Sequence, residues 1–357
     1  MDVQFSEEEL LLHESILGQA EKLGPSSVAG YEDFDDRLLW ERLAAGGALG
    51  LGLPEALGGA GTVSDASIAA SALGQALAPV PYLGCGVLPA HLLAAAGADP
   101  AVIDAVISGR RRLAVGVDPA TFEPATFEPA TGRGAPAMGP GAPAMAWDAA
   151  GADGALLRGA DGGLVVVGLD GPTPGVDLTR VVRRCQPHRP IDAGDLGGPL
   201  TPDALRWWRA LALGLVAADM VGVMQGGLQL AVEHASTREQ FGVAIGSFQA
   251  IQHLLADQLV SVAGARSTAV YAAWALQRRG LDEAELAAHT TKAYCSDVGK
   301  RLCEAVVQVH GGMGVTWECR AHVFLKRMLF DRAFLGDERW HLRRIAERRR
   351  TEAGRGL

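Results

Sequence analysis

The sequence predicts an α+β fold that is mainly α, with a small β region between two helical ones. Helical periodicity fills both ends of the chain, whereas β-rich runs separated by turn residues are confined to the middle. We therefore predict an N-terminal all-α domain over 1–111, a middle β domain over 112–198 and a C-terminal helical domain over 199–357. The long helical patterns of the last region indicate a four-helix bundle.

The N-terminal region carries five helical patterns. Ser6 and Glu9 have the spacing of a capping box, in which the hydroxyl and the carboxylate each satisfy a backbone N–H of the first turn. Ser64 or Asp65 is expected to cap a later helix, and glycines stop several of the others. The predicted helices begin after Ser6 and then cover 36–47, 64–78, 88–97 and 100–109.

The middle region consists of short strand patterns. Residues 112–118 and 176–185 have strand character, and 154–170 is a hairpin pattern of two β-rich runs joined by a turn containing Gly and Asp. Between these strands, 119–145 is a low-complexity stretch of tandem echoes rich in Pro, Gly and Ala. Such a composition buries too little apolar surface to order itself, so we predict an expanded flexible loop.

The C-terminal region predicts long helices. Pro202 suits the first turn of a helix over 201–236, which is apolar on more than one side and is therefore expected to lie in the core. Further helices are predicted over 247–280 and 282–312, and a last one runs from about Cys319.

Composition narrows the classes of function. The net charge is −9, and the basic residues are scattered or gather in a short run at 343–350, so a nucleic-acid partner is not expected. That run is interpreted as the solvated end of a helix. No apolar stretch is expected to span a membrane, and the acidic N-terminus lacks a secretory signal. Five cysteines in spacings that suit neither zinc nor disulfides favour a reduced, cytoplasmic protein.

Two segments between predicted helices carry the most specific signals. In the first, Arg238 and Gln240 stand just before Phe241; in the second, a helix breaks at the glycine pair Gly311 and Gly312. Glycine allows close approach of a ligand, and free backbone N–H groups with an arginine suit a diphosphate. Taken singly, each segment could be a turn between helices, since a glycine pair after a helix is commonly a C-cap.

Together, the two segments resemble the acyl-CoA dehydrogenase family, flavoenzymes that introduce a 2,3 double bond into acyl thioesters. A Trp…Gly-x-x-Gly-Leu…Pro-Glu pattern within 38–61 is similar to the same family, so the resemblance covers both helical ends. It implies an FAD cofactor whose diphosphate and ribose are contacted across a subunit interface, so flavin binding needs at least a dimer. The residues that match the family's FAD-binding positions are Arg238, Gln240, Phe241 and Gln249 and, at the adenine end, Gln308, Gly311 and Gly312.

The chemistry of this family needs a carboxylate base that removes a Cα proton while hydride leaves Cβ for the flavin. Counting from Gln308 along the family's pattern places that base at Leu335, which is followed by Gly336. The second base location known in the family falls on Ala212. Neither Leu nor Ala can accept a proton, so no catalytic residue is predicted in this chain.

Other titratable residues are weaker candidates. Asp337 or Glu338 could act as base if the register slips by two or three residues, at the loss of the glycine match. Asp219 lies in an apolar helical pattern and could be a buried acid with a perturbed pKa, about two turns from the expected base position. His310 and His322 lack ligand partners at useful spacing, so no metal is predicted.

The β region departs from the family. The flavin-facing motif is only echoed at 127–132, the strand that backs the flavin is missing, and Trp147 is a stray candidate for the tryptophan of that strand. The chain is therefore not expected to hold a flavin ring in its own β domain.

These departures favour the subunit without a base of a heteromeric acyl-CoA dehydrogenase. The chain resembles the short subunits of actinobacterial α2β2 dehydrogenases that act on steroid side-chain CoA thioesters. This resemblance implies a homologous partner subunit, a bulky acyl-CoA substrate and an electron acceptor similar to electron-transfer flavoprotein. One alternative is a self-sufficient homo-oligomeric acyl-CoA or acyl-carrier-protein dehydrogenase with Asp337 or Glu338 as base. Another is a structural or regulatory subunit without FAD contact.

Overall fold

The computed structural model describes residues 6–118 and 144–355 of the chain. The expected loop at 119–145, except for its last two positions, and the motif echo at 127–132 therefore lie outside the described residues. Within the described parts, the fold is mainly helical with one small barrel, as the sequence predicts.

Five α-helices form the N-terminal region. The capping box at Ser6 is confirmed, because its hydroxyl accepts from the Glu9 N–H at 3.2 Å and its own N–H donates to the Glu9 carboxylate at 2.8 Å. The cap expected at Ser64 or Asp65 is wrong: Thr62 is the N-cap, and Asp65 takes the third helical position of a second capping box. The helices are α1 (Glu7–Leu23), α2 (Arg37–Ala45), α3 (Val63–Gln75), α4 (Leu88–Ala96) and α5 (Pro100–Ile107), with 3₁₀ turns at Ala29–Tyr31, Ala48–Gly50 and Glu55–Leu57 and a π-helical segment at Tyr82–Val87.

Five strands close into a barrel in the order β1-β2-β5-β4-β3, with β1 and β3 parallel and the other pairs antiparallel. The hairpin predicted over 154–170 is confirmed as β3 and β4. The strand expected over 176–185 begins only at Val182, because the Asp177 carboxylate forms a local turn by accepting from the Thr179 N–H at 2.9 Å. The strands are β1 (Leu113–Val117), β2 (Met145–Ala146), β3 (Gly154–Arg158), β4 (Leu164–Thr173) and β5 (Val182–Ile191).

The C-terminal region is a four-helix bundle extended by a fifth helix. Thr201 caps the first helix by accepting from the Ala204 N–H at 3.1 Å, and Pro202 opens it as expected. The last helical stretch predicted from about Cys319 is present, but a break at 334–337 divides it into two helices. The helices are α6 (Pro202–Thr237), α7 (Gln249–Arg278), α8 (Leu281–His310), α9 (Ala321–Ala333) and α10 (Glu338–Arg355), with short turns at Ile245–Ser247 and Gly311–Val315.

Helix α6 is the central helix of the molecule. It packs closely on α3, where a Cβ at Gly222 would lie 1.9 Å from the Ser71 carbonyl oxygen, so that only glycine fits. The expectation that no apolar stretch reaches membrane-spanning length is wrong, since α6 and α7 both do so by length and composition. In α6, 94% of the most apolar 18-residue window is buried inside the fold, which makes it a core helix.

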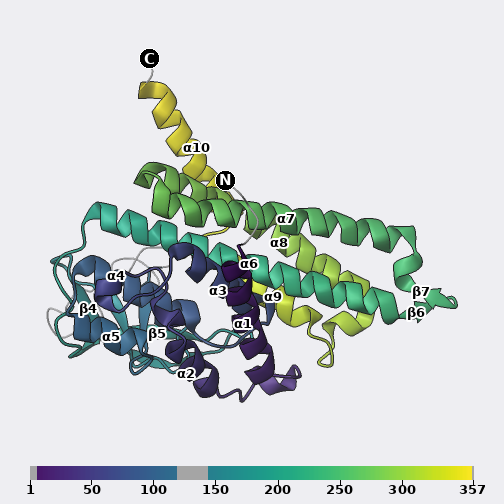
Figure 1. Cartoon of the computed structure of the whole chain (residues 1–357), viewed down its shortest axis with the longest axis horizontal. Helices are drawn as coiled ribbons and strands as arrows, with labels where there is room; N and C mark the ends of the chain where they lie inside the picture. Colours follow the sequence, from purple (N-terminus) through teal and green to yellow (C-terminus); the bar gives the residue numbers. More distant parts are fainter. Residues whose placement is uncertain (1–5, 119–143, 356–357) are drawn as a thin grey trace.

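Helix α7 differs, because only 39% of its corresponding window is buried. Leu259 and Val260 are exposed on it. Figure 1 shows α6, α7 and α8 along the long axis of the molecule, with the N-terminal helices and the barrel on the far side of α6 from α7. A short hairpin of β6 (Glu239–Gln240) and β7 (Val243–Ala244) lies at one end of the bundle, and α10 projects from its side (Figure 1).

Candidate functional site

The predicted base position lies in the break between α9 and α10. Leu335 is 1% exposed and has φ +59°, in the left-handed region that costs a non-glycine residue about 1–2 kcal/mol. Gly336 follows at φ +102°. The backbone of this segment is thus held in an unusual shape, although the side chain at its centre has no acid–base chemistry.

A buried lysine holds this shape in place. Lys292 of α8 is fully buried, and its Nζ donates to the carbonyl oxygens of Gly336 at 2.8 Å and Arg332 at 3.1 Å. It therefore caps the C-terminus of α9, where a cation also opposes the helix dipole. Burial lowers the pKa of Lys292 to about 8.

Two histidines complete the support of this turn. His341 Nε2 donates to the same Gly336 carbonyl at 3.1 Å, since a carbonyl can only accept. Its Nδ1 must then accept from His289 Nδ1, 2.8 Å away. Burial lowers the pKa of His289 to about 4 and that of His341 to about 2, so both rings are neutral at pH 7.

The adjacent carboxylates, Asp337 and Glu338, serve local structure. Asp337 Oδ1 accepts from the Trp340 N–H at 3.0 Å and caps α10. Glu338 forms a two-pronged pair with Arg332 at 2.6 and 2.7 Å, and hydrogen bonding to this arginine lowers the pKa of Glu338. Neither carboxylate lines the pocket at Leu335. This disfavours the alternative in which a register shift of two or three residues makes Asp337 or Glu338 the base.

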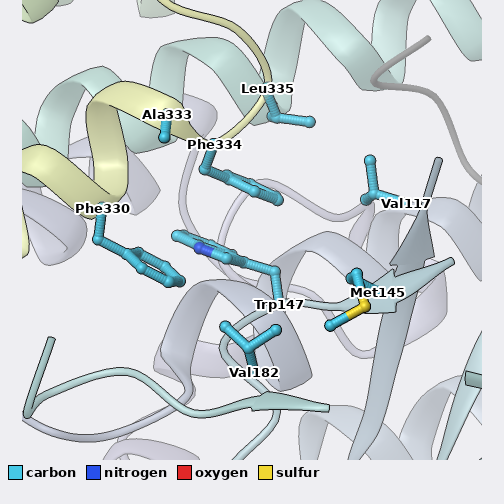
Figure 2. Close-up of a pocket in the computed structure, with 8 residues that line it drawn as sticks. All are labelled: Val117, Met145, Trp147, Val182, Phe330, Ala333, Phe334 and Leu335. Atoms are coloured by element: carbon cyan, nitrogen blue, oxygen red, sulfur yellow. The ribbon is translucent and has the colours of Figure 1, made fainter. Parts of the chain in front are cut away.

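A pocket of about 230 Å³ lies between the barrel and this break. Trp147 fills much of the surrounding space: its ring lies 3.6 Å from the Phe334 ring at 3° and 5.4 Å from the Phe330 ring at 12°. Figure 2 shows the indole between the two phenylalanines. The pocket is lined by Val117, Met145, Trp147, Val182, Phe330, Ala333, Phe334 and Leu335.

These residues do not fit a flavin ring. A base and a flavin must lie on opposite sides of the acyl thioester, so the space next to Leu335 would have to hold the acyl group and, beyond it, the ring. There the Trp147 indole is already in face-to-face contact with Phe334, and apart from the indole N–H of Trp147 the lining side chains offer no hydrogen-bond donor for the polar edge of the ring. From the sequence, Trp147 is only a stray candidate for the tryptophan of the strand that backs the flavin; the fold brings it against α9.

A buried ion-pair network joins the three predicted domains. Arg327 of α9 donates to both oxygens of Asp219 of α6 at 2.7 and 3.0 Å, and Arg180 after the barrel's β4 donates to Asp219 at 3.1 Å. Arg180 also pairs with Asp148 at 2.5 Å, and the Asp148 carboxylate accepts from the Gly84 N–H of the N-terminal region at 3.0 Å. Removing one member of such a network typically costs about 3–5 kcal/mol.

The network also settles the ionisation of Asp219, which the sequence suggested as a perturbed acid. Burial opposes its ionisation, but Arg327 and Arg180 outweigh burial and lower the pKa of Asp219 to about 2. Burial and the nearby Asp219 charge raise the pKa of Asp331 well above its ordinary value. Asp219 is therefore a fixed anion in an ion pair and is unsuited to removing a proton.

The side chain at the second predicted base position also cannot accept a proton. Ala212 is completely buried in α6 among apolar neighbours. In the part of the chain that the structure describes, no group of three or more His, Cys, Asp or Glu could hold a metal ion. The five cysteines are buried and unpaired.

The predicted FAD-binding residues differ from the buried residues around Leu335, because they lie on the surface at one end of the bundle. Arg238 ends α6, Gln240 lies in β6, and Phe241 is 95% exposed at the tip of the β6–β7 hairpin. Phe241 and Gly242 have φ of +54° and +80°, as a two-residue hairpin turn requires. Gln249, also exposed, begins α7.

The second motif lies beside the first. Gln308 is exposed near the end of α8, and Gly311 and Gly312 follow it, also exposed. Gly311 has φ +62° and ψ −142°, a conformation essentially open only to glycine. The rings of His234 and His310 stack at 4.3 Å, which joins the ends of α6 and α8 and so brings the two motifs together.

Comparison with known proteins identifies the family. The sequence profile described as "Acyl-CoA dehydrogenase, C-terminal domain" matches residues 212–349. Acyl-CoA dehydrogenase IpdE2 of Mycobacterium tuberculosis is 32% identical over 359 residues, which cover 95% of this chain and 96% of the relative. The chain belongs to the acyl-CoA dehydrogenase family.

Other relatives and solved structures extend this comparison. Acyl-CoA dehydrogenase FadE27 of M. tuberculosis is 33% identical over 330 residues, 87% of each chain. A variant of the "Tcur3481-Tcur3483 steroid ACAD" has a TM-score of 0.82 at 27% identity and covers 98% of this chain and 99% of its own. The ChsE4-ChsE5 complex from M. tuberculosis has a TM-score of 0.78 at 29% identity, with 97% and 98% covered.

Proposed function

We propose that this chain is the subunit without a catalytic base in a heteromeric, FAD-dependent acyl-CoA dehydrogenase. The observation that carries the proposal is Leu335, an apolar, buried side chain at the family's base position on a backbone still held in its unusual shape. The reaction is the formation of a 2,3-enoyl thioester on a bulky acyl-CoA such as one with a steroid side chain. The base and the flavin-ring site are assigned to a homologous partner chain in an α2β2 assembly.

Two of the similar structures support a partner chain, since each is named as a pair: Tcur3481-Tcur3483, called a steroid ACAD, and ChsE4-ChsE5, called a complex. The open side of α7, with Leu259 and Val260 exposed, is consistent with an interface between subunits. A cytoplasmic location and an electron acceptor similar to electron-transfer flavoprotein are part of the same proposal.

The exposed motif residues would act on the partner's cofactor. FAD, when bound, supplies the hydride acceptor of the reaction. Arg238 offers a positive charge to the diphosphate, and Gln240 and Phe241 lie beside it on the same hairpin. Gln308 and the backbone of Gly311 and Gly312 are exposed and would contact the adenine. All of these side chains are free to meet a second chain because they lie on the surface.

Expression tests the proposal. The chain is produced alone and together with a homologous dehydrogenase subunit that carries a glutamate at a base position, and flavin absorbance and oxidation of a steroid side-chain acyl-CoA are measured. We expect activity and stoichiometric flavin only in the co-expressed complex. A yellow, active homo-oligomer of this chain would overturn the proposal and return Asp337 or Glu338 to consideration.

A substitution separates the proposal from a purely structural subunit. In the complex, Arg238→Ala is expected to lower flavin content or raise the FAD dissociation constant at least tenfold, because a diphosphate loses a charged partner. Arg344→Ala, which removes an exposed arginine of α10, is the matched control and should leave flavin content unchanged. Unchanged flavin in both variants would mean that the motif no longer contacts FAD.

A further inference from the structure

Helix α10 carries a row of arginines on its outer side. Between 338 and 351 the chain holds six arginines and two glutamates. The inner side of the helix is attached to the bundle, where His341 is buried and Arg348 pairs with Asp282 of α8 at 3.3 Å. Figure 1 shows the helix projecting from the bundle past α7. The outer side is therefore uncovered by the described parts of this chain.

The outer row has a regular spacing. Arg343 and Arg350 are exposed and lie seven residues apart, which is two turns or about 10.5 Å along the helix. Among the described residues, neither forms an ion pair, and the same holds for Arg339, one turn before Arg343. Leu342, 56% exposed, the small Ala346 and Glu347, which pairs with Arg344 at 3.6 Å, lie between these arginines. A cationic face with an exposed leucine is suited to an acidic partner that also offers apolar contact.

Helix α1 presents the opposite charge with the same repeat. Glu7, Glu14 and Glu21 follow one another at seven-residue intervals along its exposed side, and none is ion-paired within 6–118 or 144–351. Leu11 lies between the first two and is 65% exposed. Gly18 lies between the last two, where a Cβ would meet no atom within 4 Å.

The acidic row faces outward because the other side of α1 is in the core. Ile16 and Ala20 are buried on that side, and α1 packs on α3 there. Arg343 and Arg350 therefore match Glu14 and Glu7 in charge and in their seven-residue spacing, whereas Arg339 and Glu21 lie outside this match. An antiparallel alignment sets Arg350 opposite Glu7 and Arg343 opposite Glu14, with Ala346 opposite Leu11.

We propose that α10 of one copy of this chain docks antiparallel along α1 of a second copy, through these paired arginines and glutamates. The proposal rests on the proposed function only in requiring an assembly with two copies of the chain. A polyanion such as nucleic acid or an acidic lipid surface fits less well, because the chain as a whole carries a net charge of −9 and repels it. Partly exposed ion pairs are screened by salt, so the contact is sensitive to ionic strength.

Cross-linking between two separately labelled copies tests the contact. One copy carries Ala346→Cys and the other carries Leu11→Cys, and the full chains are mixed and treated with a short bis-maleimide. The native cysteines are buried and do not interfere. We expect a covalent dimer at low salt that falls at least tenfold at about 0.5 M NaCl. Leu38→Cys, on the exposed side of α2, replaces Leu11→Cys as the matched control and should give no dimer.

Charge reversal then decides whether the named pairs form. Arg343→Glu in the Ala346→Cys copy should reduce the covalent dimer at least tenfold, and Glu14→Arg in the other copy should restore it. An equal yield with the Leu38→Cys control, or no restoration by the double reversal, overturns the proposal. So does Arg343-dependent binding to anionic vesicles or DNA without any cross-link. These readouts need neither FAD nor activity, so a failure here is distinct from a failure of the proposed function.

Discussion

The break between α9 and α10 and the motif-bearing end of the bundle have opposite characters. At the break, Leu335 is buried and the rings of Trp147 and Phe334 are stacked. Lys292 holds the backbone there by donating a hydrogen bond to the Gly336 carbonyl. At the bundle end, Phe241 is almost fully exposed and the backbone of Gly311 is open to solvent. Under the proposed function, a base position without acid–base chemistry is filled by the chain's own side chains, whereas residues that contact a partner's FAD must stay uncovered.

The largest effect is expected where the aromatic stack is removed. Trp147→Ala takes away a buried ring that contacts both Phe330 and Phe334, and a large aromatic-to-alanine change in a core typically costs about 3–5 kcal/mol of unfolding free energy. Denaturant unfolding measures it. If the unfolding free energy falls by less than about 1 kcal/mol, the aromatic stack is not part of the core. The interpretation that it fills the space beside Leu335 is then wrong.

Acid should weaken the turn beneath Leu335. The pKa of His289 is lowered to about 4 in the fold against an ordinary value near 6.5, so the unfolded chain binds more protons between these values. Stability therefore rises with pH from 4 to 6.5 and is lost on acidification, by about 3 kcal/mol for a shift of this size.

Unfolding in urea across pH 4–7 measures this effect. His289→Gln, which cannot be protonated, should make the profile shallower in this range, while His341 and His91, whose pKa values burial also lowers, still contribute. His253→Gln, at an exposed position of α7, is the control for the loss of a histidine by itself. An unchanged profile in His289→Gln would show that other groups cause the acid sensitivity.

Alanine substitution at two glycines, one at the break and one at the motif-bearing end of the bundle, compares the two regions through a smaller effect on stability. At Gly336, φ is +102° and a Cβ would lie 2.9 Å from the Trp340 ring, so Gly336→Ala should cost about 1–3 kcal/mol. At Gly312, a Cβ meets nothing within 4 Å, so Gly312→Ala should change stability by less than about 0.5 kcal/mol. Thermal melting of both variants measures the two losses of stability. Equal losses would contradict the difference between the two regions.

The smallest stability effect is expected for Phe241→Ala. The ring is 95% exposed, so its loss should change the unfolding free energy by less than about 0.5 kcal/mol. In the assembled complex, however, it should weaken FAD retention during gel filtration. A variant that melts early, or a complex that keeps its flavin fully, would show that Phe241 faces its own chain after all.

Local patterns in the sequence accounted for much of the fold. The capping box at Ser6, the β3–β4 hairpin and the cap and first turn of α6 follow from residues that are neighbours in the chain. Two errors have local causes, since Thr62 caps α3 and a turn at Asp177 delays the start of β5. The division between α9 and α10 involves a distant contact, because Lys292 of α8 holds the turn at Gly336. The apolar residues on more than one side of α6 predict that it lies in the core, and the packing of α3 and α8 around it confirms this prediction.

The sequence by itself determined the family, the absence of a carboxylate at Leu335 and Ala212, and the presence of two segments that resemble the family's FAD-binding motifs. These are properties of residue identity and spacing, which need no coordinates. Only the tertiary structure decided that Trp147 takes the space beside Leu335, that Asp219 is a fixed anion, and that the two motifs meet at one exposed end. Each of these depends on which side chains approach from elsewhere in the chain, and therefore on packing and burial rather than on local sequence.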